Sequence, residues 1–241
     1  MKGTVIALLS ILGGAAAWAQ NVNAPAIKAG DTWTYRETTE KGVSGWNQSR
    51  DEVTISRVTA SSIYYMLKPA GSTQPPRESI SGLDWSRARD VNGKETIVNR
   101  PLYFPLTVGK SWQIEYTEQH PTKTHKSEQW NHKYTVVGFE TVEVPAGQFN
   151  AVKVESEGHW TAELEPMQTV VQGAQSTADS TSMVTQAQRT RSEPVTGRTY
   201  KAFWYSPEVK RWVKAVEEYY SAGGVRNERY TQELESYKVS E

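Results

Sequence analysis

Short runs of alternating polar and apolar residues, separated by Gly, Pro and Asn, follow one another along most of this chain. Alternation over about four to eight residues is typical of a strand with one buried face, and near-regular turn signals between such runs favour an antiparallel sheet. We therefore predict an all-β, single-domain fold: a large, curved antiparallel sheet or half-barrel, similar to a β-sandwich, with about ten strands. The predicted strands are residues 32–37, 52–57, 62–67, 111–118, 133–144, 149–161, 199–206, 211–220 and 227–237.

The most specific local prediction is a β-hairpin that joins residues 141–144 to residues 149–154. Pro145 presets the first turn residue, and Gly147 can adopt the positive φ that closes a three-residue loop with a bulge. Four valines are expected to share one inner face of this hairpin: Val142, Val144, Val152 and Val154.

Residues 1–19 have the three parts of a secretory signal peptide. Lys2 gives a basic start, residues 5–12 are apolar, and Ala17 and Ala19 form the small-residue end at which cleavage is expected. The apolar run is shorter than the roughly 20 residues that a membrane-spanning helix needs. We therefore predict that this segment is a cleaved signal peptide and that the protein is exported.

Composition narrows the class of protein that the remaining residues, 20–241, can form. The whole sequence has 27 basic and 27 acidic side chains, so we expect no general attraction to nucleic acid. It has no Cys, so packing and hydrogen bonds must hold the domain together, and we expect no lipid-modified Cys. We predict a single β-rich domain that is periplasmic in a Gram-negative bacterium or secreted, with no transmembrane segment in the mature chain.

The aromatic composition is unusual, with nine Trp and twelve Tyr but four Phe. Trp and Tyr combine a large apolar surface with a polar tip, so they suit half-buried sheet faces and the linings of clefts. A curved sheet could gather several of them on its concave face as an apolar ligand site, whereas core packing is the alternative that ordinary burial favours. The candidate ligand-binding residues are Trp33, Tyr35, Trp112, Tyr116, Trp204 and Trp212.

The sequence carries no local signature of catalysis or of metal binding. It has no Cys, no Gly-x-Ser-x-Gly elbow and no glycine-rich phosphate loop, so we predict no catalytic residue and no cofactor, and we favour a non-enzyme. His120, His125 and His132 are spaced too irregularly for a zinc site, so we interpret them as surface histidines and predict no metal. Carboxylates on distant strands could still form a glycosidase pair that local spacing does not reveal.

Two segments of the chain share a pattern. Residues 26–40 (AIKAGDTWTYRETTE) and 105–119 (PLTVGKSWQIEYTEQ) each contain Gly-x-x-Trp, followed by a Tyr and by Thr-Glu. The match suggests two related halves that open with the same turn into a strand.

Residues 163–197 differ in composition from the rest of the chain. They are rich in Gln, Ser and Thr and contain no aromatic residue. A segment with so little apolar surface to bury is expected to be an exposed hairpin or a mobile loop.

Three motifs in order resemble a family of known sequences: FPLTVGKSW at 104–112, ETVEVPAGQFNAVKV at 140–154 and FWYSPEVKRWVK at 203–214. Together they resemble the TapB-like exported bacterial proteins, an uncharacterised group related to domains of unknown function. The resemblance covers roughly residues 100–220 and implies a Gram-negative envelope setting and a β-rich fold, similar to the half-barrels of LolA/LolB-type lipoprotein carriers. It implies no established activity. Where such relatives usually carry a Gly in the last motif, this chain has Lys210-Arg211, so the turn there is expected to differ.

The leading functional hypothesis is a non-enzymatic binding or envelope-assembly protein that holds an apolar ligand, such as a lipid or acyl chain, on a concave aromatic face. One alternative is a structural or interaction module that pairs with an envelope protein through an exposed hairpin or sheet edge. Another is a carbohydrate-active hydrolase.

Overall fold

The computed structural model describes residues 21–177, 180–190 and 193–241. Within these ranges the chain is built of strands, with one short 3₁₀ helix, η1 (Gly42–Ser44). Ten strands form one antiparallel sheet in a single domain, which confirms the predicted fold class. The strands are β1 (Thr32–Glu40), β2 (Trp46–Val58), β3 (Ser62–Pro69), β4 (Arg77–Gly82), β5 (Arg87–Val91), β6 (Lys94–Asn99), β7 (Ser111–Gln119), β8 (His125–Val144), β9 (Gly147–Leu164), β10 (Met167–Thr177), β11 (Ser180–Thr190), β12 (Val195–Ser206), β13 (Arg211–Ser221) and β14 (Arg226–Lys238).

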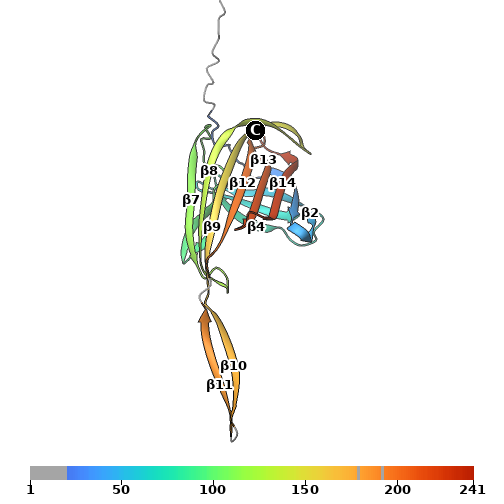
Figure 1. Ribbon diagram of the computed structural model, residues 1–241. Helices are drawn as coiled ribbons and strands as arrows, with labels where there is room; N and C mark the ends of the chain where they lie inside the picture. Colours follow the sequence, from blue (N-terminus) through green and yellow to red (C-terminus); the bar gives the residue numbers. More distant parts are fainter. Residues whose placement is uncertain (1–20, 178–179, 191–192) are drawn as a thin grey trace, which may run out of the picture.

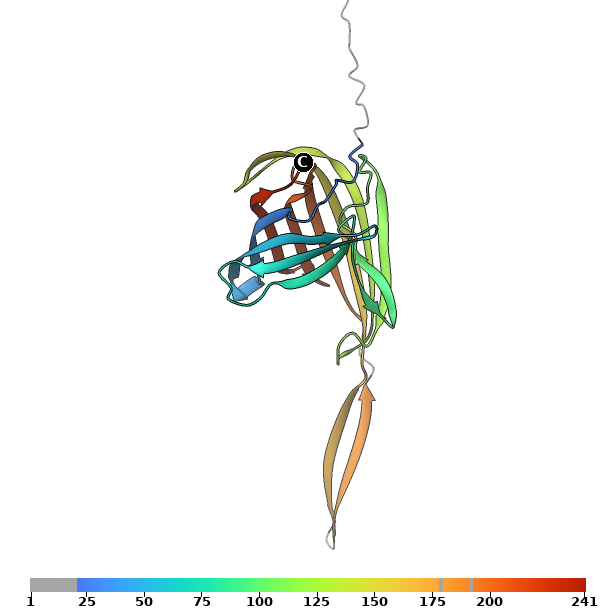
Figure 2. The same ribbon diagram turned by 180° about the vertical axis from the view of Figure 1, so that it is seen from behind.

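The main sheet has the strand order β4-β3-β2-β1-β14-β13-β12-β9-β8-β7. The first and last strands of the sequence, β1 and β14, pair in the middle of this sheet. The sheet is strongly bent, so that its two halves face each other. In Figure 2, β2 to β4 cross in front of β12 to β14, and in Figure 1 they lie behind them. The result is a half-barrel whose concave face surrounds the hydrophobic core.

A separate two-stranded sheet, β5–β6, lies between the two edge strands β4 and β7. Arg89 on β5 forms a two-pronged ion pair with Glu118 on β7, with an Nη1–Oε1 distance of 2.6 Å. Asn92, in the β5–β6 turn, donates to the carbonyl of Thr117 at 2.8 Å. These contacts hold β5–β6 against β7 at the opening of the half-barrel. The sequence patterns did not predict β4, β5 or β6.

The long hairpin β8–β9 arches over the end of the sheet at which the chain terminates (Figure 1). At its tip, the N–H of Ala146 donates to the carbonyl of Leu234 on β14 at 2.9 Å. The ring of Phe149 packs edge-on against Tyr237, with the ring centres 5.9 Å apart. The tip therefore closes one end of the concave core.

The predicted hairpin is confirmed in place, but its loop and its faces differ from the prediction. Val144 pairs with Gly147, so the loop has two residues rather than three. Val142 pairs with Phe149 and shares a face with it, whereas Val152 alternates with Ala151 and lies on the other face. All four predicted valines are buried: the face of Val142 and Val144 is covered at the tip, where Thr141 and Glu143 on the other face are exposed, and the face of Val152 and Val154 is covered further along β9.

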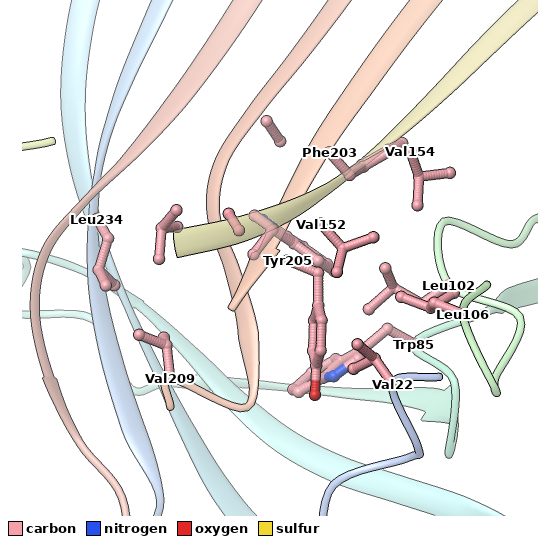
Figure 3. Packing of buried hydrophobic residues seen from close by; sticks show 14 of the residues in the cluster. Val22, Trp85, Leu102, Leu106, Val152, Val154, Phe203, Tyr205, Val209 and Leu234 are labelled. Atoms are coloured by element: carbon pink, nitrogen blue, oxygen red, sulfur yellow. The ribbon is translucent and has the colours of Figure 1, made fainter. Parts of the chain in front are cut away.

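The core fills the concave side of the sheet and reaches into the loop between β6 and β7. Leu102 and Leu106 from this loop are fully buried, and Val22 forms an isolated antiparallel bridge with Leu106. Figure 3 shows this group beside Tyr205 of β12, with Val209 and Leu234 on the far side of the core. The N-terminal segment thus seals the core before β1 begins.

Strands β10 and β11 pair with each other over their full length and form a third sheet. In both views this hairpin projects away from the half-barrel, at the end opposite to the C-terminus (Figures 1 and 2). It occupies most of the Gln/Ser/Thr-rich segment 163–197, whose exposure and mobility stay predictions. The predicted signal peptide, residues 1–19, lies outside the described residues. Across the ranges that the structure describes, no helix combines the length and hydropathy of a membrane span.

The two Gly-x-x-Trp segments adopt the same geometry. Gly30 has φ 91° and its N–H donates to the carbonyl of Ile55, while Gly109 has φ 85° and its N–H donates to the carbonyl of Val136, at 2.9 and 2.8 Å. A positive φ of this kind favours glycine at both positions. Each turn then leads directly into a strand, β1 or β7, that buries its Trp.

Candidate functional site

All six candidate aromatic residues lie in the hydrophobic core or pack against it. Trp33, Tyr35, Trp112 and Trp212 are buried, and Tyr116 and Trp204 are half-buried. The polar tips of the four Trp residues and of Tyr35 are bonded within the protein, as when the Nε1–H of Trp33 donates to the carbonyl of Val209 at 2.8 Å. Core packing therefore accounts for most of their surface.

The six residues do not form one cluster. Tyr35 donates from its hydroxyl to the carbonyl of Trp212 at 2.7 Å, and both lie near Trp33 around the start of β13. Trp112 and Tyr116 instead belong to a row of rings along β7 and β8. Trp204 bonds through its Nε1–H to Glu140 and alternates with core residue Phe203, so it lies on the opposite face of β12.

A cavity of about 430 Å³ opens on the concave side of the sheet, with walls from β1, β12, β13 and β14. Ligand sites commonly have volumes of about 300–1,000 Å³. The apolar part of its lining comes mainly from aromatic rings, which belong to Tyr65, Trp85, Phe203, Trp212, Tyr219 and Tyr230. The polar part includes Glu37, Ser81, Arg87, Asn99, Arg211, Glu217, Glu228 and Gln232. We call this space the Arg211 cavity.

Arg211, the first residue of β13, is 5% exposed. Its Cζ atom lies 4.4 Å from the ring centres of both Trp85 and Trp212, 5.0 Å from that of Tyr35 and 5.6 Å from that of Trp33. Its Nε and Nη1 atoms have no hydrogen-bond partner among the described residues. Burial lowers the pKa of Arg211, but a guanidinium keeps its proton in proteins. The cavity therefore contains a buried cation held by aromatic rings.

Glu37 on β1 is part of a hydrogen-bonded chain in the same cavity. Trp212 donates from Nε1 to Oε1 of Gln232 at 2.7 Å, and Gln232 donates from Nε2 to Oε1 of Glu37 at 2.5 Å. Burial raises the pKa of Glu37, although the bond from Gln232 and the charge of Arg211 oppose the rise. The side-chain amide of Gln232 therefore fixes the position of the Glu37 carboxyl group.

The pKa of a second carboxylate of the cavity, Glu217, is shifted in the opposite direction. Burial disfavours its charge, but the ammonium of Lys201 at 3.2 Å and the hydroxyl of Tyr219 at 3.1 Å together lower the pKa of Glu217. Two carboxylates with oppositely shifted pKa values are the pattern of a general acid and a base. The hydrolase alternative was predicted without naming its carboxylates, and it stays a prediction.

Two further donors of the Arg211 cavity are buried without a hydrogen-bond partner among the described residues, the Nε1–H of Trp85 and the hydroxyl of Ser81. Trp85 also has φ 58°, a left-handed backbone conformation that costs a non-glycine residue about 1–2 kcal/mol. The ring is held in place by edge-on contacts with Trp33 and Trp212, at centre distances of 5.6 and 5.9 Å. Strain of this kind is often found at binding sites.

A second cavity, of about 730 Å³, lies between β4 and the β5–β6 sheet. Ser81 contributes to the lining of both cavities. Much of its lining is apolar, from Ile80, Leu83, Ala88, Ile97, Tyr103 and Phe104. Ile80 is 54% exposed and Leu83 is 41% exposed, which leaves apolar surface open to a ligand.

The row of rings along β8 contains a histidine that was predicted to be at the surface. His132 is 3% exposed and stacks against Trp130 at 5.7 Å, so the surface interpretation is wrong for this residue. It is buried because its ring covers Gly158, its cross-strand partner on β9. Burial, with a contribution from the charge of Lys201, lowers the pKa of His132 to about 4. His120 and His125 instead bond to Glu165 and Glu128.

The sequence patterns missed Arg211 and Trp85. Arg211, Trp212 and Val213 are buried in succession, and alternation along a strand cannot predict that both faces are covered. Trp85 lies in the turn between β4 and β5, where no strand pattern exists. Within the described ranges, no group of three His, Asp or Glu side chains is arranged to hold a metal ion.

Comparisons with known proteins give two similar structures and no family. No family model matches the chain, and no curated protein matches it. A "putative lipoprotein" from Parabacteroides distasonis ATCC 8503 has 16% sequence identity and a TM-score of 0.44, over 91% of this chain and 100% of that one. A "putative exported protein with YmcC-like fold" from Bacteroides fragilis NCTC 9343 has 16% identity and a TM-score of 0.37, with the same coverage. The resemblance to TapB-like proteins therefore stays a hypothesis.

Proposed function

We propose that this protein is an exported, non-enzymatic binding protein that holds a small ligand with an apolar part on the concave side of its half-barrel. The observation that carries the proposal is the Arg211 cavity, whose volume of about 430 Å³ is in the range of ligand sites. Aromatic rings and a few convergent polar groups line it, which is the usual composition of such sites. Export is proposed from residues 1–19, in a Gram-negative periplasm or outside the cell.

The site proposed from the structure differs in part from the six predicted aromatic residues. Trp212 lines the cavity. Trp33 and Tyr35 do not line it, but their rings contact the guanidinium of Arg211. Trp112, Tyr116 and Trp204 do not line it, and we assign them to packing. The apolar part of the ligand is proposed to extend past Ser81 into the second cavity.

The test is native mass spectrometry, with organic extraction, of the mature chain purified from a bacterial periplasm. Ala215 on β13 lines the cavity, so Ala215→Leu reduces its volume without removing a polar group. Trp204→Ala, on the opposite face of the sheet, is the control. We expect a stoichiometric small ligand with the wild type and with Trp204→Ala, and its loss with Ala215→Leu. A ligand-free wild-type mass, together with no binding of amphiphiles by the purified protein, would contradict the proposal.

A second candidate function is the capture of a partner chain by the β10–β11 hairpin. The observation that favours it is that these two strands pair with each other and, among the described residues, with no strand of the half-barrel. An isolated two-stranded sheet is marginally stable in water and gains from the addition of a strand. Shortening the hairpin to a turn is expected to abolish capture of an envelope partner and to leave ligand binding unchanged.

A further inference from the structure

The charge on Arg211 is not matched by a protein group. Its Nε and Nη1 atoms lack a hydrogen-bond partner, and none of the ion pairs in the described part of the chain includes its guanidinium. Glu37 attracts it through space but is bonded to Gln232. Burial of a charge without an ion-pair partner is unfavourable, and the aromatic rings around Arg211 stabilise the cation without giving its N–H groups an acceptor. A group that brings negative charge to Arg211 would therefore be bound strongly.

Two other buried polar groups in the cavity also lack a hydrogen-bond partner among the described residues, and both can donate a hydrogen bond. The Nε1–H of Trp85 is a donor, and the hydroxyl of Ser81 can donate. Trp85 lies directly beside Arg211, with its ring centre 4.4 Å from Cζ. Three side chains with free N–H or O–H groups in one cavity favour an acceptor that has several oxygen atoms.

The charges around the cavity do not oppose this assignment. Glu217 is neutralised by Lys201 at 3.2 Å, and Glu228 is paired with Lys41 at 3.3 Å. Arg87, also in the lining, adds a second cation. Glu37 remains as a carboxylate near Arg211, and its Oε1 already accepts a hydrogen bond from Gln232.

We propose that Arg211, with Trp85 and Ser81, binds the anionic oxygen head group of an amphiphilic ligand, a carboxylate or a phosphate. This inference rests on the proposed function, because it assigns the polar end of the ligand in the same cavity. The apolar chain is assigned to Ile80, Leu83 and Ile97 of the second cavity, whose lining also includes Ser81.

The test compares three probes with the same ten-carbon chain, which are decanoate, decyl phosphate and 1-decanol. Binding to the delipidated mature chain is measured by titration calorimetry. Because a hydrogen bond to a charged group contributes about 1.5–3 kcal/mol, at least one of the two anions is expected to bind roughly ten- to a hundredfold more tightly than the alcohol. The preferred anion identifies the head group as a carboxylate or as a phosphate.

Arg211→Met keeps an unbranched apolar side chain and removes the guanidinium and its charge, so anion affinity is expected to fall to that of 1-decanol. Arg57→Met is the matched control, because the Arg57 guanidinium also lies over an aromatic ring, 3.8 Å from the centre of Tyr64, but is exposed. It is expected to bind all three probes like the wild type. Should Arg211→Met not fold, Trp85→Phe replaces it, with a severalfold loss of anion affinity and no change for the alcohol.

Equal binding of all three probes by the wild type would overturn the head-group assignment and leave the proposed function standing. Binding of none of them would overturn both. A loss of affinity in Arg211→Met that is equal for the anions and the alcohol would also overturn the assignment, because it would show that Arg211 supports the shape of the cavity alone.

Discussion

The guanidinium carbon of Arg211 lies 4.4 Å from the centre of the Trp85 ring, deep in the concave side of the half-barrel. Trp85 comes from the turn that follows β4, at one edge of the sheet, whereas Arg211 begins a central strand. Their contact therefore depends on the bend of the whole sheet. This contact joins β13, which forms part of the cavity wall, to the turn that leads into the β5–β6 sheet.

Replacement of Arg211 by Met is expected to leave the ligand-free protein at least as stable as the wild type. The substitution removes an unpaired buried charge and keeps an apolar chain among the rings, a change that is often neutral or stabilising by about 1–4 kcal/mol. Urea unfolding of the delipidated proteins measures the difference. A loss of more than about 1 kcal/mol would indicate that the cation–π contacts outweigh the cost of burial.

Asp31 is expected to stabilise the fold in a pH-dependent way. Burial opposes its charge, but hydrogen bonds from the backbone N–H groups of Ser240 at 2.7 Å and Lys28 at 3.0 Å hold the pKa of Asp31 below its ordinary value. A lowered carboxyl pKa adds stability above the unfolded-state pKa of 3.8, and this stability is lost as the pH falls through the lower folded-state value.

The variant Asp31→Asn is therefore expected to lose about 1–3 kcal/mol of unfolding free energy at pH 7, with a smaller loss at pH 3. Urea unfolding at the two pH values gives the comparison. Glu52→Gln, at an exposed position of β2, is the control and should change little. An equal loss for Asp31→Asn at both pH values would argue against a charge effect.

His132 is expected to make the protein less stable as the pH falls from 6.5 to about 4. Its folded-state pKa of about 4 lies below the ordinary value of 6.5, so within this window the unfolded chain binds a proton that the folded chain does not. The loss is expected to reach roughly 2–3 kcal/mol.

The pH dependence of stability tests this directly. His132→Phe keeps a ring between Trp130 and Tyr134 and should remove much of the slope between pH 4 and 6.5. His159→Phe, at an exposed position of β9, should keep most of the slope, because the charge of His159 makes the smallest contribution to the lowered pKa of His132. An unchanged slope in His132→Phe would show that other groups cause the acid sensitivity.

Gly158 is expected to tolerate no side chain. A Cβ atom at this position would lie 2.6 Å from the Thr199 hydroxyl oxygen and 2.9 Å from the Asn131 carbonyl oxygen, with the His132 ring also in the way. Gly158→Ala should therefore cost about 1–3 kcal/mol by overpacking. Gly138→Ala is the matched control, because nothing lies within 4 Å of its Cβ position. Thermal unfolding of the two variants should differ clearly, and equal melting temperatures would contradict the crowding.

Much of the fold could be predicted from local pattern, because strands with one buried face alternate and are separated by turn residues. The predicted C-terminal strand, 227–237, is confirmed as β14. The short strand β5 was missed because all but one of its side chains are exposed, and β4 and β6 were missed because they are short and have almost no apolar alternation. The turn at Lys210 keeps a left-handed φ of 62° without a glycine, since the Lys210 ammonium bonds to the carbonyl of Ala26 at 2.9 Å.

The candidate site could be predicted less well. The excess of Trp and Tyr over Phe indicated large rings with a polar tip, but nothing local distinguishes Trp212, which lines the cavity, from Trp112, which does not. Arg211 becomes a buried cation through the convergence of rings from β1, β13 and the β4–β5 turn. Long-range convergence of this kind has no signature in spacing along the chain.

The most direct measurement is the ¹H–¹⁵N spectrum of the tryptophan indole and arginine Nε–H groups, recorded as decanoate or decyl phosphate is added to the delipidated protein. The resonances of Arg211 and Trp85 are assigned by their loss in Arg211→Met and Trp85→Phe. Our account predicts that these two signals shift with at least one of the two anions, while the indole signal of Trp204 stays in place. Binding that shifts neither Arg211 nor Trp85, or that shifts Trp204 instead, would contradict it.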